Sequence, residues 1–296
     1  MISAAVRAAA ARVRVLVIGS LNVDLILVAD REPVDESAVT VRSVSTEVGG
    51  HAGNCAAALA ALGVSVAVAG AVGADDDGDR LVADLRGRGV DVAAVRRRAE
   101  PTGRVVIPVF GDRHYMLLCR GANDTFGPTD LREALAGDYD AVMLFDPPRD
   151  ALRAVGACAT LLCWTPGGVF AGDPVTATVL PHTDILFVNR FEHDELATAP
   201  GPDTDVVITL GAVGSTLRRG AQEVTVHAHP VPVVDPTGAG DAFAAAYLLA
   251  HLAGLPPSSR LAAGNAAGAL AVGAVGARGR PATVPDLLSA LTRDRP

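Results

Sequence analysis

Hydrophobic and polar positions along the chain separate two kinds of predicted strand. Residues 13–18 are apolar except for Arg14 and are followed by Gly19, a pattern typical of a parallel strand buried on both faces. Similar short runs lie at 64–69, 141–145, 160–164, 185–188 and 206–210. Helical patterns are found between many of these runs, at 52–62, 75–88, 130–136 and about 150–157. This alternation predicts an α/β fold, a doubly wound and mostly parallel sheet with helices on both faces.

Two other segments alternate apolar with polar residues, as half-exposed strands do. In residues 38–48, Val39, Val41 and Val44 are interspersed with polar side chains, and the runs at 92–97, 103–109 and 114–119 have a similar character. We predict one domain over residues 1–296, with insertions at about 24–48 and 92–120 forming a small β-sheet lid. A hairpin at 215–226 and apolar helices at 239–253 and 258–275 complete the pattern.

Composition indicates a folded protein that acts on small molecules. Hydrophobic residues make up 50% of the chain and mean hydropathy is +0.33, which excludes a disordered chain. The net charge of −8 leaves no broad cationic surface for nucleic acid or an anionic membrane. The N-terminus lacks the apolar core of a signal peptide, and Cys55, Cys119, Cys158 and Cys163 form no CxxC pair. We therefore expect a cytoplasmic protein with reduced thiols.

The complete absence of lysine excludes several chemistries. All 25 residues counted as Lys or Arg are Arg. A Walker A loop, a Schiff-base enzyme and a protein kinase each require a lysine amine. Any phosphate chemistry must therefore rely on Arg side chains, backbone dipoles and metal ions.

The segment 233–243 carries the sharpest chemical signal. An apolar run delivers Asp235, a glycine-containing turn follows, and a helix begins near Ala239. Unpaired N–H groups and the positive end of the helix dipole make such a turn an anion site. Asp241 in the first turn could serve only as a complement to the dipole. A carboxylate beside an anion cradle is also what phosphorylation of a hydroxyl requires.

The segment from Asp235 to Asp241 resembles the D-[TP]-x-G-A-G-D signature of the ribokinase-like carbohydrate kinases, the PfkB family. The glycine-pair signature of that family is matched by residues 49–56, and its N-x-x-E motif by residues 189–192. The resemblance extends over essentially the whole chain. It implies the ribokinase-like fold and an ATP-dependent sugar kinase.

The resemblance also implies a role for individual residues. Asp241 would be the catalytic base, and the N–H groups of Gly238, Ala239 and Gly240 would hold the γ-phosphoryl group of ATP. Asn189 and Glu192 would organise Mg²⁺ through water. The remaining positions implied for the nucleotide are Thr209, Gly211, Gly214 and Asn265, and those for a monovalent cation such as K⁺ are Asp235 and Thr237.

Acceptor-binding positions implied by the resemblance are Asn22, Asp24, Gly50, His51 and Asn54. Carboxylate and amide groups of this kind suit the hydroxyls of a polyol ring. Asn22 and Asp24 would by themselves equally well form a turn after a strand. His51 stands where ribokinases carry Lys, and Arg190 stands where the family usually has an acidic residue. Arg120 could meet a carboxylate or phosphate on the acceptor.

The function predicted from the sequence is ATP-dependent phosphorylation of a hydroxymethyl group on a sugar or sugar-like molecule. A nucleoside kinase of the same family and a catalytically silent sugar-binding protein remain the alternatives. Apolar residues of the predicted lid, including Val41 and Val106, further predict a homodimer joined through the lids.

Overall fold

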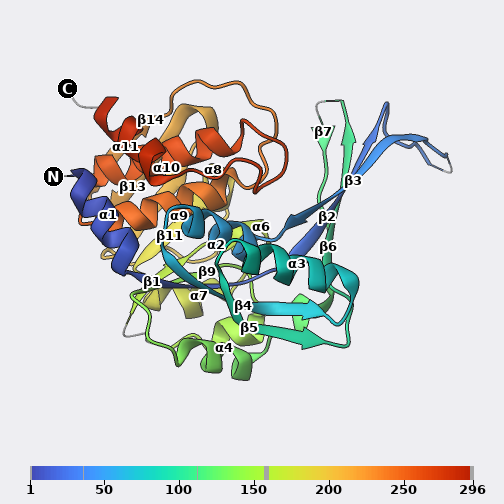
Figure 1. Ribbon diagram of the computed structural model, residues 1–296, viewed down its shortest axis with the longest axis horizontal. Coiled ribbons are helices and arrows are strands. Elements are labelled where there is room, and N and C mark those ends of the chain that lie inside the picture. Colours follow the sequence, from blue (N-terminus) through green and yellow to red (C-terminus); the bar gives the residue numbers. More distant parts are fainter. Residues whose placement is uncertain (1, 36, 112, 157–159, 294–296) are drawn as a thin grey trace.

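The computed structural model describes residues 2–35, 37–111, 113–156 and 160–293 (Figure 1). Within these residues the larger sheet has nine strands. Their order is β14 (Gln222–His227), β13 (Gly214–Arg219), β12 (Asp205–Thr209), β11 (Ile185–Asn189), β10 (Leu161–Trp164), β9 (Ala141–Leu144), β1 (Arg14–Ile18), β4 (Ser65–Gly73) and β5 (Asp91–Arg98). The strands from β12 to β5 are parallel, and only β13 and β14 are antiparallel. The predicted mostly parallel sheet is confirmed.

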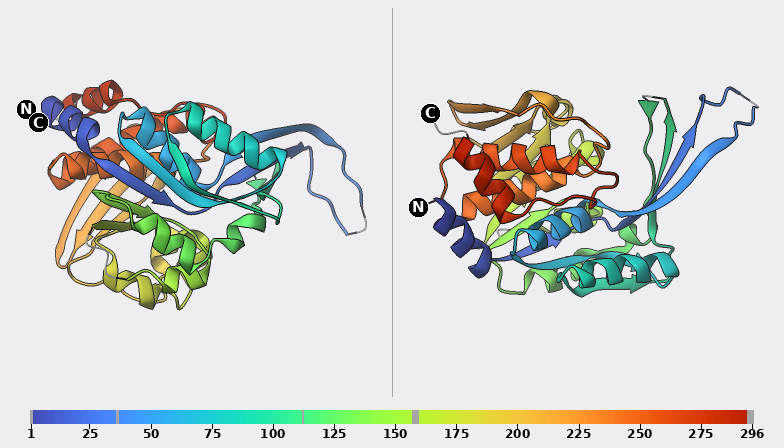
Figure 2. Two further views of the ribbon diagram at one scale, coloured as in Figure 1. Left: turned by 60° about the horizontal axis from the view of Figure 1, so that its bottom comes forward. Right: turned by 45° about the horizontal axis from the view of Figure 1, so that its top comes forward.

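Helices cover both faces of this sheet (Figures 1 and 2). One face packs against α1 (Ile2–Arg12), α2 (His51–Ala61), α3 (Asp76–Gly87), α9 (Ala239–Leu252), α10 (Pro257–Ala271) and α11 (Val284–Arg293). The other packs against α4 (Pro128–Leu135), α5 (Arg149–Arg153), α6 (Gly167–Phe170) and α7 (Thr176–Val179). In β1, Val15 and Val17 join the first core whereas Leu16 and Ile18 join the second. This is why its sequence is apolar from Val15 to Ile18.

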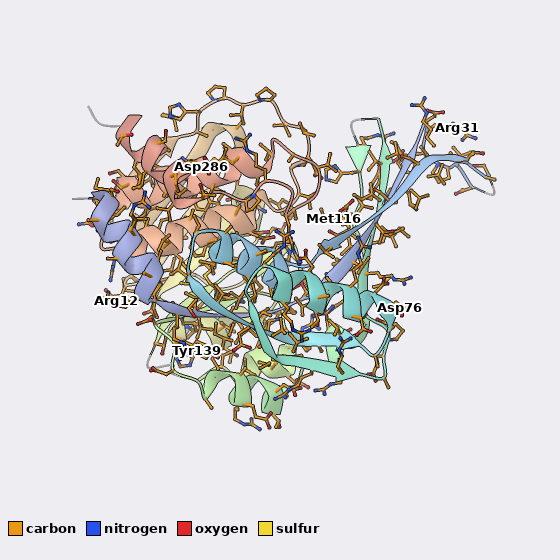
Figure 3. The ribbon with its side chains drawn as sticks, viewed as in Figure 1. Arg12, Arg31, Asp76, Met116, Tyr139 and Asp286 are labelled. Carbon is orange, nitrogen blue, oxygen red and sulfur yellow. The ribbon has the colours of Figure 1, made fainter. Side chains whose placement is uncertain are left out.

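A second, five-stranded sheet projects from the body in the described residues (Figure 2). Its strands are β2 (Asn22–Ala29), β3 (Val41–Gly49), β6 (Gly103–Phe110), β7 (Arg113–His114) and β8 (Leu117–Cys119). Arg31, labelled in Figure 3, lies near the tip of this projecting sheet, far from the body. The base of the sheet meets the main sheet where β2 follows β1.

The predicted boundary of the lid is wrong at one strand. Residues 91–98 form β5, which pairs with β4 at the edge of the main sheet and is not part of the projecting sheet. Its alternating burial is that of an edge strand, whose Arg96 and Arg98 pair with Asp130 in α4. The second insertion therefore begins with β6 at Gly103.

Several helices differ from the sequence prediction. The last long helix ends at Ala271, four residues before the predicted end, and a loop over 272–279 follows. Two helices that the pattern did not predict, α1 and α11, pack against the first core. The predicted helix near 150–157 is confirmed only in its first part, as α5 over Arg149–Arg153; residues 154–156 do not continue the helix, and residue 157 lies outside the described residues.

In the described residues, three cysteines are free thiols and no helix is suited to cross a membrane. Cys55, Cys119 and Cys163 are free thiols, and Cys158 lies outside the described residues. Within the described ranges, none of the helices combines the length and the hydropathy that a bilayer crossing would require.

Candidate active site

The start of α9 forms an anion cradle. Gly238 precedes the helix in a left-handed conformation (φ 76°), with Ala277 packed where a side chain would otherwise lie. In the described structure the N–H groups of Gly238, Gly240 and Asp241 donate to no protein acceptor, while that of Ala239 reaches the Pro236 carbonyl at 3.3 Å. A Cβ added to Gly240 would meet nothing within 4 Å, so the space in front of these donors is open. Free donors and the helix dipole together favour an anion here.

Asp241 is buried in the first turn of α9, and its carboxylate does not cap the helix. One oxygen, Oδ2, accepts a hydrogen bond of 3.0 Å from Nδ2 of Asn54, and the other lies 3.0 Å from Nδ1 of His51. Both partners come from α2, which the chain reaches directly after the glycine pair. The carboxylate is thus held in one orientation beside the anion cradle.

His51 is the cation that faces Asp241. Its ring stacks on Phe145 with centroids 5.9 Å apart and an interplanar angle of 4°. Burial lowers the pKa of His51, but the charge of Asp241 and the hydrogen bond to it raise the pKa by more. The net shift is upward, so the ring is protonated at neutral pH and balances the buried carboxylate.

Asn22 and Asp24 lie in β2, so the alternative of a simple turn does not hold. Being two residues apart in one strand, they share a face. Both are buried, and Gly49 packs so closely that an added Cβ would lie 2.2 Å from Oδ2 of Asp24. Burial raises the pKa of Asp24 to about 6, with Arg278 and His51 lowering it in part and Asp241 and Asp235 raising it further.

The predicted nucleotide-binding residues converge on one cavity of about 440 Å³. Four of them, Thr209, Gly211, Gly214 and Asn265, line its wall together with Ala239 and Gly240 of the cradle. Apolar side chains including Val231, Phe243 and Val272 complete the lining. Asn265 itself ties α10 to the neighbouring hairpin, because it accepts from Ser215 Oγ at 2.9 Å and donates to the Val226 carbonyl at 3.0 Å.

Asn189 and Glu192 lie outside this cavity and form a capping box at α8 (Arg190–Asp194). Asn189 Oδ1 accepts from the Glu192 N–H at 2.9 Å, and Glu192 Oε2 accepts from the Asn189 N–H at 3.0 Å. Burial raises the pKa of Glu192, the Asn189 N–H and His51 lower it, and Asp241 raises it. The second carboxylate oxygen of Glu192 has no protein donor in the described chain, so it fits a metal-bound water near the cradle.

The cradle, the oriented carboxylate and the adjoining cavity match a known group of proteins. A family model described as the pfkB family carbohydrate kinase matches residues 13–283. The chain belongs to this family. It is an ATP-dependent carbohydrate kinase.

Relatives of this kinase span its whole length. It is 33% identical to the ATP-dependent ribose-1-phosphate kinase of Halopiger xanaduensis, over 96% of this chain and 99% of the relative. It is 30% identical to the ribokinase of Bacillus subtilis, over 93% of this chain and 99% of that protein. The structure of Arabidopsis thaliana ribokinase complexed with ribose and ATP is similar with a TM-score of 0.81 at 27% identity, covering 94% and 98% of the two chains.

The loop before α9 in the kinase holds the residues expected near a monovalent cation. Asp235 Oδ1 accepts from the Thr237 N–H at 2.9 Å, and Oδ2 accepts from the Gly276 N–H at 2.8 Å. Burial raises the pKa of Asp235, but these hydrogen bonds lower it by more, so the carboxyl is ionised at neutral pH. The bond from Gly276 holds the loop over residues 272–279 against the segment that precedes the cradle.

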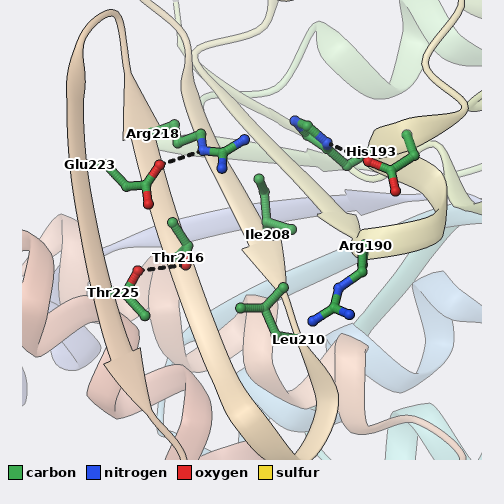
Figure 4. A pocket seen from close by; sticks show the side chains of 9 residues that line it. Arg190, His193, Ile208, Leu210, Thr216, Arg218, Glu223 and Thr225 are labelled. Atoms are coloured by element: carbon green, nitrogen blue, oxygen red, sulfur yellow. Dashed lines mark hydrogen bonds and ion pairs between the residues drawn. The ribbon is translucent and has the colours of Figure 1, made fainter.

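Arg190 does not face the cradle but lines a second cavity of about 360 Å³ (Figure 4). This cavity lies on strands β12, β13 and β14 beside α8 and contains none of the predicted site residues. Two polar contacts, the ion pair of Arg218 with Glu223 and the contact of His193 with Asp194, are internal to the wall (Figure 4). The departure from the usual acidic residue therefore does not alter the charge of the catalytic carboxylate directly.

Two residues of the site were missed by the sequence analysis. Asn123 accepts from the Leu21 N–H at 2.9 Å and donates to Asn22 Oδ1 at 2.8 Å, which fixes the amide of Asn22. Arg278 donates to Asn54 Oδ1 at 3.1 Å. Arg120, which the sequence suggested as a partner for a carboxylate or phosphate on the acceptor, pairs with Asp124 and donates to the Asp146 carbonyl at 2.9 Å. No local pattern marks Asn123 or Arg278, because their partners lie more than a hundred residues away.

Proposed function

We propose that this kinase transfers the γ-phosphoryl group of ATP to a hydroxymethyl group of a sugar or sugar-like acceptor. The observation that carries the proposal is Asp241, oriented by Asn54 and His51 between the anion cradle and the buried polar face of β2. The acceptor lies against Asn22, Asp24, Gly50 and Asn54 with its hydroxyl toward Asp241. The carboxylate takes the hydroxyl proton while that oxygen attacks the γ-phosphorus atom, the bond from this atom to the β–γ bridging oxygen breaks, and ADP leaves.

The free N–H groups of the cradle and the protonated His51 stabilise negative charge during this transfer. We propose that Asn189 and Glu192 would hold the water shell of Mg²⁺, which would supply charge neutralisation at the phosphates. In the described residues no group of three His, Cys, Asp or Glu side chains could enclose a metal ion. Glu192 is one of two carboxylates, with Asp24, that feel the charges of both His51 and Asp241.

The acceptor class includes sugar phosphates as well as free sugars. Two cations, His51 and Arg120, lie close to the acceptor-binding residues, because His51 contacts Asp241 and the backbone carbonyl of Arg120 accepts from Asn123, which also donates to Asn22. The relative from Halopiger xanaduensis is named for ribose 1-phosphate. The test is ATP turnover with Mg²⁺ against free sugars, sugar 1-phosphates and nucleosides. Transfer to sugars or their phosphates supports the proposal. Transfer to nucleosides alone identifies a nucleoside kinase, and no transfer at all identifies a silent binding protein.

Gly240→Ala is expected to fold normally and to lose phosphoryl transfer by about 10-fold or more. The methyl group meets no protein atom within 4 Å, so folding is not impaired. It occupies the space that the phosphate oxygens need when they approach the free N–H groups. Steady-state kinetics and thermal unfolding measured side by side check this. Turnover within about twofold of the wild type would place the phosphate elsewhere.

We propose that a monovalent cation binds beside Asp235 and Thr237 against the loop 272–279. The ionised carboxylate of Asp235 and the carbonyl groups of this glycine-rich loop are suitable oxygen ligands. Activity is expected to be higher in potassium buffer than in a matched tetramethylammonium buffer. Equal activity in the two buffers would contradict a cation at this position.

We propose that the projecting sheet closes over the acceptor and joins two copies of the chain. It exposes the apolar side chains of Val41, Val44, Tyr115, Met116, Leu117 and Leu118. Met116 is labelled in Figure 3. The valines at positions 39, 106 and 109 are half-buried and add further apolar surface to this region. Sedimentation velocity at micromolar concentration is expected to give twice the chain mass of 30.1 kDa. A fully active monomer would contradict the dimer.

We propose a cytoplasmic location because the described cysteines are free thiols. Cys55 and Cys163 are buried and Cys119 is exposed, all in the free state that a reducing compartment maintains.

A further inference from the structure

Arg278 buries a guanidinium group at the junction of the base, the acceptor-binding strand and the cation loop. The residue is only 6% exposed. Its three nitrogens reach three separate segments: Nε donates to Asn54 Oδ1 at 3.1 Å, Nη2 donates to the Gly49 carbonyl at 2.8 Å, and Nη1 pairs with Asp84 Oδ2 at 2.6 Å. The planar fork of Arg fixes the relative positions of such partners better than any other side chain.

The first of these contacts sets the orientation of Asn54. Because the amide oxygen of Asn54 accepts from Arg278, the amide nitrogen is the atom turned toward Asp241 Oδ2, 3.0 Å away. A flipped amide would bring its oxygen against the carboxylate and leave the guanidinium without an acceptor. The chain Arg278–Asn54–Asp241 thus determines which way the base points.

The second contact anchors the acceptor-binding end of the projecting sheet. Gly49 is the last residue of β3, pairs with Asn22 of β2 and lies directly against the carboxylate of Asp24. Holding the Gly49 carbonyl therefore fixes the backbone against which Asp24 and Asn22 are placed. The positive charge of Arg278 also lowers the pKa of Asp24 against the effect of burial.

Local sequence is adapted to this side chain. A Cβ on Gly53 would come within 2.1 Å of Arg278 Nη2, so the guanidinium requires glycine at that position of α2. Burial lowers the pKa of Arg278. The hydrogen bond to Asp84 and the charge of Asp84 raise that pKa and so oppose the effect of burial. Asp84 keeps a second cation, Arg88 at 3.0 Å, and would not be left unpaired if Arg278 were replaced.

We propose that Arg278 is a positioning residue that orients the base through Asn54 and the acceptor carboxylate through Gly49, so that base and acceptor stay in register. The inference rests on the proposed phosphoryl transfer. It assigns to one side chain the alignment of two groups that come from different elements, helix α9 and strand β2 of the projecting sheet. Arg278 does not touch the reacting atoms.

The test compares Arg278→Met, Arg278→Lys and the control Arg88→Gln. Arg88 shares Asp84 with Arg278 but has no contact with Asn54 or Gly49, so Arg88→Gln should leave all kinetic constants within about twofold. Arg278→Met is expected to lower kcat by about 10-fold or more and to raise KM for the acceptor, with a smaller change in KM for ATP, because misalignment affects the reacting geometry. Arg278→Lys should recover part of kcat.

The second measurement on the same variants is a pH titration of Asp24 in the absence of substrate. The ¹³C resonance of its carboxyl group reports the protonation state. The groups that face Asp24 are Arg278, His51, Asp241 and Asp235, and only the first is changed. The midpoint near pH 6 should move upward in Arg278→Met and stay near its place in Arg278→Lys. An unchanged midpoint, or kcat and acceptor KM within twofold in folded Arg278→Met, would overturn the inference.

Gly53→Ala tests the same inference independently, and it serves if Arg278→Met fails to fold. The added methyl group displaces the guanidinium without removing its charge. It is expected to lower kcat as Arg278→Met does, and wild-type kinetics in this variant would overturn the inference. Failure of the proposed function is distinguishable, because the wild-type protein would then transfer no phosphoryl group while the Asp24 titration would still report on Arg278.

Discussion

Asp241→Asn is expected to fold and to bind ATP as the wild-type protein does, while kcat falls by about 10²–10⁴-fold, the range attributed to a positioned general base. The amide oxygen can still accept from Asn54, and the amide nitrogen can donate to Nδ1 of a neutral His51. The geometry of the site therefore survives, while the ability to accept a proton and the positive charge that Asp241 maintains on His51 are both removed. Steady-state kinetics, ATP binding by calorimetry and thermal unfolding together provide the measurement.

The matched control for this variant is Asp286→Asn. Asp286 also lies in the first turn of its helix, α11, where its carboxylate accepts from the N–H of Thr283 at 2.9 Å. Loss of that charge affects the helix terminus but not the active site. Its kcat should match the wild type. Near-native turnover in Asp241→Asn would contradict the assignment of the base.

Asp24→Asn is expected to make the protein more stable and less active. Burial raises the pKa of Asp24 in the folded state to about 6, from its ordinary value of 3.8. An acid with a raised folded pKa destabilises the fold while it is ionised, above pH 6, and this cost disappears as pH falls from 6 to below 4. At pH 8 the substitution should therefore raise the free energy of unfolding by up to about 3 kcal/mol.

The same substitution removes the charged acceptor for the substrate hydroxyls. Hydrogen bonds to a charged group contribute about 1.5–3 kcal/mol, so kcat/KM for the acceptor should fall by about 10–10²-fold. In the wild type, KM for the acceptor should rise as pH falls below 6, whereas in Asp24→Asn this acid limb should be absent. Denaturant unfolding and pH-dependent kinetics check both parts. A destabilised variant, or an acid limb that persists, would contradict the role of Asp24.

The main sheet was predictable because its burial pattern is local. The apolar run in β1 identified a strand with neighbours and cores on both sides, and β1 does lie between β9 and β4. The limit of this reasoning is β5. An edge strand of the main sheet and a strand of the projecting sheet are both half-exposed, so alternation could not assign residues 91–98 to one or the other.

The site was predictable as far as its motifs extend. The residues around Asp241, Asn54 and Asn22 were identified by the resemblance, and the structure brings Asp241 and Asn54 into contact across 187 residues. Arg278 had no such signal, because a Gly-rich loop with arginines is typical of an exposed segment. Its burial depends on the simultaneous presence of Gly49, Gly53 and Asp84, which only the folded chain assembles.

The most direct test of phosphoryl transfer to a hydroxymethyl oxygen with Asp241 as the base is ³¹P NMR of the product. The product is formed from ATP, Mg²⁺ and the best acceptor of the sugar and sugar-phosphate panel. A phosphoryl group on a hydroxymethyl oxygen couples to the methylene protons, and its resonance splits into a triplet. We expect this triplet with the wild-type protein and its loss, on the same timescale, with Asp241→Asn. A doublet, which marks transfer to a ring hydroxyl, or an equal rate with Asp241→Asn would contradict the account.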